Sequence, residues 1–286
     1  MLNTILLQSD STVAANTQTA DLADGLTSMG GAIDALKEQV GMIAESLNHS
    51  VDPTNYVSFT FFIGYMAMLA ASVFFFFERS RVADKWKMSL LVSGLITMIA
   101  AFHYYYMRDY HLATGQSPTF FRYVDWILTV PLMCVEFYLL TKLAGAKKSL
   151  LWKLIAASTW MLVAGYIGEA LGSGTSHSVT WGVISTLGYL YILHSVWLGE
   201  VAQLAQSSGV DSVKKGVRAL AWFVLVGWAI YPIGYMCMDG GWLNLALGWG
   251  SQNVDLWYNI ADAINKIGFG LVVYNIAYTE TQKELA

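Results

Sequence analysis

RYVDWILTVPLMCVE, residues 122–136, places two carboxylates and an arginine inside a stretch that is otherwise apolar. Ionisable groups within a membrane span are costly and usually functional. At about 100° per residue, Thr129 and Glu136 fall within about 40° of Asp125, so the three share one helix face. Arg122 lies one turn back on that face, and Glu136 lies about 16 Å along the helix axis from Asp125. A stripe with one carboxylate in each half of a membrane indicates a proton path, and a structural polar network is the alternative.

The composition around this stretch is that of a membrane protein. Of the 286 residues, 56% are hydrophobic and 13% are charged, and the mean hydropathy is +0.48. Seven apolar segments are each long enough to cross about 30 Å of hydrocarbon as a helix. They lack the alternation of barrel strands. We expect them at about 56–78, 87–108, 119–142, 150–171, 178–200, 217–238 and 254–279. The sequence therefore predicts an all-α membrane protein whose domain of residues 55–286 is a seven-transmembrane-helix bundle.

Residues 1–54 differ from this domain and form a predicted extracellular N-terminal extension rich in Ser, Thr, Ala, Asp and Gly. The opening MLNTILL is too short for a standard signal peptide and lacks a basic start, although a residual targeting segment remains an alternative. Apolar residues then repeat at spacings of three and four, which predicts one stripe on a helix. They are Ile33, Leu36, Val40, Ile43 and Leu47. We expect a short amphipathic helix on the membrane or on the protein's own outer face, and binding of a partner has no independent support.

Lysine and arginine predict the orientation of the chain. They gather at the first, third and fifth connections between segments, whereas the second carries Arg108 and the fourth and sixth carry none. The basic residues are Arg79, Arg81, Lys85 and Lys87, then Lys142, Lys147, Lys148 and Lys153, then Lys214, Lys215 and Arg218. Positive connections stay in the cytoplasm. We therefore expect the N-terminus outside, the C-terminus in the cytoplasm, and a multi-pass protein of the cell inner membrane.

The seventh segment, YNIADAINKIGFG at residues 258–270, holds a second set of buried charges. Asp262 and Lys266 are four residues apart and share a helix face. The simple explanation is a buried ion pair. However, a lysine in apolar surroundings tends to lose its proton and readily forms Schiff bases with carbonyl compounds. His103 in the second segment is a further candidate for the same polar interior.

These motifs together carry a specific resemblance. The third-segment stretch is similar to that of proteorhodopsins and xanthorhodopsins, the microbial (type 1) retinal proton pumps. The resemblance covers about residues 55–280. Its other motifs are AFHYYYMR (101–108), GYIGEA (165–170), WGVISTLGYLYIL (181–193), GWAIYPIGY (227–235) and DAINK (262–266). It implies a light-driven outward proton pump, which is an ion transporter and not an enzyme.

The resemblance implies a role for each buried ionisable group. Lys266 would bind all-trans retinal as a protonated Schiff base. Asp125 would be its main counterion and first proton acceptor, and Asp262 the second counterion. Arg122 would stabilise this charged cluster, and Glu136 would be the cytoplasmic proton donor.

Two neutral or weakly basic residues complete the implied proton path. His103 matches a histidine that hydrogen-bonds the acceptor aspartate in these pumps. Thr129 completes the Asp–Thr–Glu pattern of the group.

The resemblance also implies a chromophore pocket. For any single aromatic residue, ordinary apolar packing would be the simpler explanation. The implied pocket residues are Trp126, Met133, Met161, Gly165, Ser185, Tyr189, Trp228, Tyr231, Pro232 and Tyr235. Met133 stands at a colour-tuning position, and an apolar residue there resembles the green-absorbing form. Gly182 matches a glycine that opens a window for a hydroxylated carotenoid antenna, although a small residue also simply allows close helix contact.

Other functions fit the residues less well. A sensory rhodopsin that signals to a partner is the main alternative, and Glu136 favours a pump because sensors often lack this carboxylate. A chloride pump would need a neutral residue at Asp125, and a sodium pump would carry Asn and Gln in place of Asp125 and Glu136. A receptor or transporter that does not bind retinal would leave Lys266 unexplained.

The remaining features limit the partners. The histidines His103, His111, His177 and His194 are scattered without metal-ligand spacing, so no metal is expected. Cys134 and Cys237 lie in apolar runs, and no basic tract suggests nucleic acid. By resemblance, the expected partners are membrane lipid and further copies of the chain, in a trimer, pentamer or hexamer.

Overall fold

The computed structural model describes residues 24–41, 51–171, 174–237 and 251–286. The chain divides into two compact units, residues 1–50 and 51–286. In the first unit, residues 24–41 form one helix. The sequence-based boundary after residue 54 falls close to this division. The predicted targeting segment and the predicted stripe residues Ile43 and Leu47 lie outside the described residues.

The described residues of the second unit are mostly helical and contain seven helical stretches long and apolar enough to cross a membrane. This confirms the predicted seven-helix fold. The helices are α2 (Tyr56–Glu78), α3 (Lys87–Thr114), α4 (Thr119–Lys142), α5 (Lys148–Ala170), α6 (Thr175–Trp197), α7 (Glu200–Ser207), α8 (Asp211–Trp222), α9 (Ile230–Cys237) and α11 (Ser251–Leu285). The segment η3 (Phe223–Gly227) joins α8 to α9, so these three make the sixth span.

Several helices run beyond the segments expected from hydropathy. The second span was expected to end near residue 108, but α3 continues to Thr114. It ends at Gly115, whose φ of 65° is left-handed and whose backbone N–H donates to the His111 carbonyl at 2.8 Å. Hydropathy marks only the part of a helix that lies in hydrocarbon, so polar turns beyond it are missed. The short helix α7 was also not predicted, because its eight residues lie in a polar connection.

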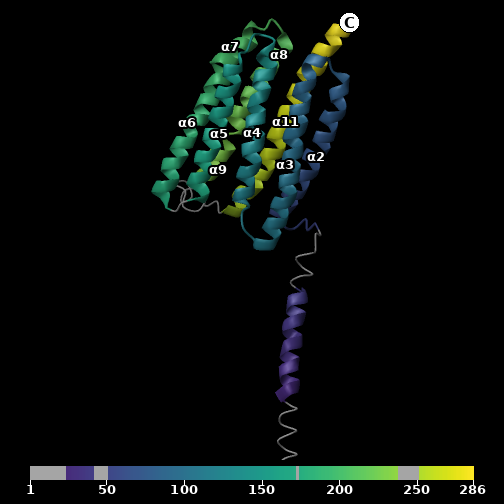
Figure 1. Cartoon of the computed structure of the whole chain (residues 1–286), viewed down its shortest axis with the longest axis vertical. Helices are drawn as coiled ribbons and strands as arrows, with labels where there is room; N and C mark the ends of the chain where they lie inside the picture. The colour runs from purple at the N-terminus through teal and green to yellow at the C-terminus, as the bar shows by residue number, and fades with distance from the viewer. Residues whose placement is uncertain (1–23, 42–50, 172–173, 238–250) are drawn as a thin grey trace, which may run out of the picture. The chain divides into compact units, whose positions relative to one another are not determined.

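The helices form a closed bundle (Figure 1). Each of α2 to α5 packs against the next in sequence, α6 packs against α5 and α8, and α11 closes the ring through contacts with α8, α9, α2 and α3. Large apolar side chains stay exposed on the outer surface, among them Phe77, Trp152 and Leu187. Because such a surface is unfavourable in water and suits lipid, the bundle is that of a multi-pass membrane protein.

The basic connections lie at the same end of the bundle as the C-terminus (Figure 1). In the first connection, the Ala83 backbone N–H donates to the Thr281 hydroxyl near the end of α11 at 2.9 Å. At the start of α8, the Ser212 hydroxyl donates to Glu280 at 2.6 Å. These contacts bring together connections that are far apart in sequence.

The sixth span contains a widened, π-helical turn at Phe223–Gly227. Such a turn leaves backbone carbonyls without their usual partners, and neighbouring side chains supply donors here. Tyr189 donates to the Val224 carbonyl at 2.9 Å, and Asn265 donates to the Gly227 carbonyl at 3.0 Å. The π-helical turn lies directly before Trp228 and Tyr231, two of the predicted pocket residues.

Candidate functional site

Lys266 is buried in the middle of the bundle and faces two carboxylates. Its Nζ lies 2.5 Å from Asp125 Oδ2 on α4 and 3.0 Å from Asp262 Oδ2 on its own helix, α11. The lysine is 3% exposed, and the two aspartates are at most 1% exposed. The structure thus brings the three residues with implied Schiff-base and counterion roles to one point. A buried charge is stable only when paired in this way.

The two carboxylates differ in what else they bind. Asp262 accepts hydrogen bonds from the hydroxyls of Tyr104 at 2.8 Å and Tyr231 at 2.5 Å, and from Trp126 Nε1 at 3.1 and 3.2 Å. Asp125 Oδ1 has no hydrogen-bond partner in the described part of the chain. The charged form of Asp262 is therefore held by fixed donors, whereas Asp125 has an oxygen available to take a proton.

Glu136 lies on the same helix as Asp125, roughly 16 Å along its axis. Its side chain is fully buried, and Oε1 accepts a hydrogen bond from the Ser93 hydroxyl of α3 at 3.0 Å. Within the described residues it forms no ion pair with lysine or arginine. An unpaired charge in this position would be costly, so the surroundings favour a carboxyl group that keeps its proton.

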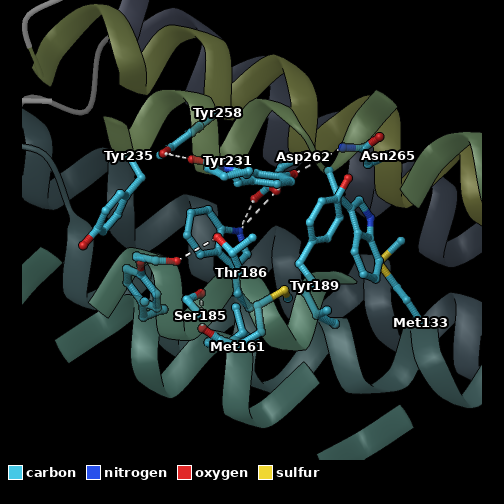
Figure 2. Close-up of a pocket in the computed structure, with 18 of the residues that line it drawn as sticks. Met133, Met161, Ser185, Thr186, Tyr189, Tyr231, Tyr235, Tyr258, Asp262 and Asn265 are labelled. Carbon is cyan, nitrogen blue, oxygen red and sulfur yellow. Dashed lines mark hydrogen bonds between the residues drawn. The ribbon is translucent and has the colours of Figure 1, made fainter. Parts of the chain in front are cut away.

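A pocket lined by residues of several helices adjoins Lys266. Figure 2 shows Met161 and Ser185 on one side of it, facing Tyr231 and Asp262 on the other. All the predicted pocket residues line it. They are Trp126, Met133, Met161, Gly165, Gly182, Ser185, Tyr189, Trp228, Tyr231, Pro232 and Tyr235, joined by Lys266 and Asp262. Its walls are mainly aromatic and apolar, which is typical of a site for a small organic ligand.

Comparison with known proteins identifies the family of this lysine-centred bundle. The family model described as "Bacteriorhodopsin-like protein" matches residues 55–280. The chain belongs to this family. It is 43% identical over 235 residues to a green-light absorbing proteorhodopsin from Gamma-proteobacterium EBAC31A08, covering 81% of this chain and 90% of that protein. It is 44% identical over 232 residues to a blue-light absorbing proteorhodopsin from Gamma-proteobacterium Hot 75m4, with the same coverage.

Solved structures of the family have the same fold. The crystal structure of a blue light-absorbing proteorhodopsin from Med12 matches with a TM-score of 0.66 and 40% identity, covering 79% of this chain and 99% of that one. Xanthorhodopsin, described as a light-driven ion pump with dual chromophore, matches with a TM-score of 0.70 and 29% identity, covering 82% of this chain and 98% of that one.

Arg122 of this bacteriorhodopsin-like protein is paired with a third buried carboxylate. Its guanidinium donates to Asp255 Oδ1 at 2.8 and 3.2 Å and to Asn259 Oδ1 at 2.8 Å, and no hydrogen bond joins it to Asp125 or Asp262. Arg122 and Asp255 are almost fully buried. Arg122 therefore acts on the carboxylates at Lys266 only through longer-range electrostatics.

His103 forms a different hydrogen bond from the one that the resemblance implies. Its Nδ1 lies 2.8 Å from the Ile99 carbonyl, one turn earlier on α3, and it forms no hydrogen bond with Asp125 in the structure. Thr129 likewise donates to the Asp125 backbone carbonyl at 2.9 Å and not to the carboxylate. Both residues thus bond to helix backbone, close to the acceptor.

The structure adds residues that sequence reasoning missed. Asp255 and Ser117 complete the Arg122 group, with Ser117 Oγ donating to Asp255 at 2.8 Å. The pocket is also lined by six residues that were not predicted: Tyr123, Val130, Leu162, Thr186, Tyr258 and Asn265. A signal for Tyr258 was present, because it lies one turn before Asp262 on the same helix face. Glu169 on α5 accepts a hydrogen bond from the Tyr123 hydroxyl at 2.7 Å.

Proposed function

We propose that this protein is a light-driven proton pump that moves protons outward, with retinal attached to Lys266. One observation carries the proposal: Lys266, which lines the pocket, contacts Asp125, whose other oxygen has no partner among the described residues, and a second buried carboxyl group, Glu136, lies about 16 Å further along α4. The similarity to a proteorhodopsin and to xanthorhodopsin, a light-driven ion pump, supports the same function. Such a protein is a transporter and not an enzyme.

The residues present fit retinal. The pocket walls are aromatic and apolar, and Lys266 supplies the amine that a carbonyl group needs to form a Schiff base. Once attached, retinal supplies the absorption of light and a change of shape at the Lys266 nitrogen. Trp126 and Trp228 line the pocket and would restrict the chromophore to an extended form.

The chain's own residues then perform the proton transfers. The proton on Lys266 Nζ passes to Asp125, which lies at hydrogen-bond distance and has no other donor on its carboxylate. Asp262 stays charged because Tyr104, Tyr231 and Trp126 donate to it. Glu136 returns a proton to Nζ from the opposite side. Net movement follows because the group that accepts and the group that supplies lie on different sides of Lys266.

The outward direction depends on the orientation of the chain. The basic connections gather at the end of the bundle that holds the C-terminus, and Glu136 belongs to the half nearer that end. By the positive-inside rule that end is cytoplasmic. The N-terminus is then outside, and a proton released from Asp125 leaves the cell.

Illumination of cells that express the chain tests the pump directly. With retinal supplied and the medium unbuffered, light should acidify the medium, and an uncoupler should abolish the change. Lys266→Ala, made in the same cells, is the matched control for light and heat effects. Light-dependent alkalinisation would contradict the direction, and a coloured protein that moves no protons would favour the sensory alternative.

We further propose a green-absorbing form with a carotenoid antenna at Gly182. Met133 is 2% exposed and lines the pocket as an apolar residue at the implied colour-tuning position. Gly182 and the exposed Thr186, one turn later on α6, line the pocket where it reaches the bundle surface. A Cβ at Gly182 would lie 3.0 Å from the Tyr235 ring, so a larger side chain would crowd this opening.

Absorption and energy transfer test these two assignments separately. The spectrum of the retinal-loaded protein should peak in the green, and a blue maximum would contradict the role of Met133. Added hydroxylated carotenoid should show induced dichroism and transfer energy to retinal, and Gly182→Trp should remove both. Absence of both signals in the unmodified protein, or their persistence in Gly182→Trp, would remove the antenna from the proposal.

A further inference from the structure

The helix of residues 24–41 carries an apolar stripe that nothing covers among the described residues of its unit. Its members are Leu26, Met29, Ile33, Leu36 and Val40, here called the seam. They are between 49% and 62% exposed. A continuous apolar face of this kind is unfavourable in water, and it marks a surface that packs against something else.

The spacing of the seam indicates what that partner is. From Leu26 to Val40 the steps are three, four, three and four residues. The sequence continues the same alternation back to Leu22 and forward to Ile43 and Leu47. A strict 3.5-residue repeat keeps a stripe facing another helix of the same kind, wound around it as a coiled coil.

The residue types agree with a parallel arrangement. In heptad terms, Leu26, Ile33 and Val40 take the a positions, and Met29 and Leu36 take the d positions. Ile33 and Val40 at a are β-branched, whereas Met29 and Leu36 at d are not, and this pattern favours parallel association in few strands. Copies inserted in one membrane share one topology, so their helices point the same way and each seam residue meets its own counterpart.

The flanks of the seam also fit close contact between helices. Of the five e and g positions next to it, three hold Gly25, Gly30 and Ala32, whose small side chains permit close approach, and the other two hold the polar Lys37 and Gln39. The acidic residues Asp34 and Glu38 take the outer b and f positions. The apolar stripe is therefore narrow, as a coiled-coil seam is, and not the broad face of a helix that covers a globular core.

A lipid surface fits this helix less well. Helices that lie on membranes combine a broad apolar face with a basic polar face. Here Asp24, Asp34 and Glu38 stand against a single cation, Lys37, which is itself paired with Asp34 at 3.2 Å. This polar face would be repelled by anionic lipid.

We propose that residues 24–41 form a parallel coiled coil with the same segment of neighbouring copies, and that this segment ties the homo-oligomer together outside its membrane domains. Gly30 and Gly31 each destabilise the helix relative to alanine. A short isolated helix is also marginal in water. The helix is therefore stabilised when copies associate, and the seam is the surface through which they associate.

Disulfide cross-linking of the full chain in lipid nanodiscs or vesicles tests the proposal. Val40→Cys places a thiol in the seam, and Ala35→Cys places one on the outer c position of the same helix. The native Cys134 and Cys237 are buried, so the unmodified chain gives the background. Val40→Cys should form intermolecular disulfides at least about tenfold faster than Ala35→Cys, because the seam holds two thiols at a high effective concentration.

A second substitution distinguishes seam packing from mere proximity within an oligomer. Adding Ile33→Asp to Val40→Cys should reduce cross-linking to the rate of Ala35→Cys, whereas Asp34→Asn should not. Equal rates for Val40→Cys and Ala35→Cys would overturn the proposal, as would an unchanged rate with Ile33→Asp. So would a fluorophore at Val40→Cys that is quenched by nitroxide-labelled lipid, since that outcome places the stripe on the membrane.

Discussion

The two halves of the bundle differ in whether their buried ionisable groups are paired with opposite charges. Around Lys266, two cations and three carboxylates are buried in two ion-paired groups: Lys266 with Asp125 and Asp262, and Arg122 with Asp255. We call this the charged cluster.

Around Glu136, by contrast, a single carboxyl group accepts a hydrogen bond from Ser93 and has no cation in contact within the described residues. A paired charge stays charged when buried, whereas an unpaired group favours its neutral form. One half of the bundle is thus suited to receive a proton and the other to supply one.

Removing the acceptor should have the largest effect on this asymmetry. Asp125→Asn leaves Lys266 with Asp262, whose oxygens are already bonded to Tyr104, Tyr231 and Trp126. We expect outward pumping to fall at least about 100-fold, because the transfer loses its base, and the absorption maximum to shift because a counterion charge is lost. Light-induced pH change and the absorption spectrum measure the two effects.

Asp125→Glu is the matched control, since it restores a carboxylate at the same place. It should recover part of the pumping. Normal pumping by Asp125→Asn would mean that Asp262 is the acceptor in spite of its bound donors.

Removing the donor should affect only the second half of the cycle. In Glu136→Gln the first transfer to Asp125 is untouched, but Lys266 must recover its proton without a nearby acid. We expect recovery after a flash to slow by roughly 100-fold, the usual contribution of a positioned general acid. Time-resolved absorption separates the two steps, and added azide, a small diffusible acid, should restore part of the rate. Recovery at the normal speed would remove Glu136 from the donor role.

Some residues of the candidate site could be predicted from the sequence alone, and others could not. Asp125, Glu136, Asp262 and Lys266 stand out because a charge in the middle of an apolar span is rare, and helical spacing assigns faces to them. Their pairing across helices, and the roles of the pocket residues, rested on resemblance.

Asp255 was missed for a physical reason. It lies near the start of the expected seventh segment, where an acidic residue is ordinary, and only the packing of α11 against the bundle makes it fully buried. The partner of Arg122 lies on another helix, so spacing rules within one helix do not reach it. The π-helical turn at Phe223–Gly227 was missed likewise, because it depends on donors from Tyr189 and Asn265 on other helices.

The Arg122–Asp255 pair offers a way to change the charged cluster without touching Lys266. Asp255→Asn keeps the size of the side chain but removes the charge that holds Arg122. We expect a loss of stability of about 1.5–3 kcal/mol, the usual value of hydrogen bonds to charged groups. We also expect a changed pH dependence of the absorption maximum, because the freed cation acts more strongly on Asp125 and Asp262.

Thermal bleaching of the retinal-loaded protein and a spectral pH titration measure these effects. Asp211→Asn, which removes an exposed carboxylate on α8, is the matched control. If Asp255→Asn matched it in both measurements, the Arg122–Asp255 pair would have no part in the charged cluster.

The smallest expected effect concerns the hydrogen bond from Ser93 to Glu136. Ser93→Ala removes the hydroxyl that donates to Glu136 Oε1 at 3.0 Å and leaves the pocket at Lys266 unchanged. One neutral hydrogen bond contributes about 1 kcal/mol, so the rate of proton supply should change about fivefold, far less than in Glu136→Gln. Thr97→Ala removes a neighbouring buried hydroxyl that bonds only to the backbone of α3 and should leave that rate unchanged. A change as large as that of Glu136→Gln would show that the proton reaches Lys266 through Ser93, and that Glu136 is less isolated than its surroundings indicate.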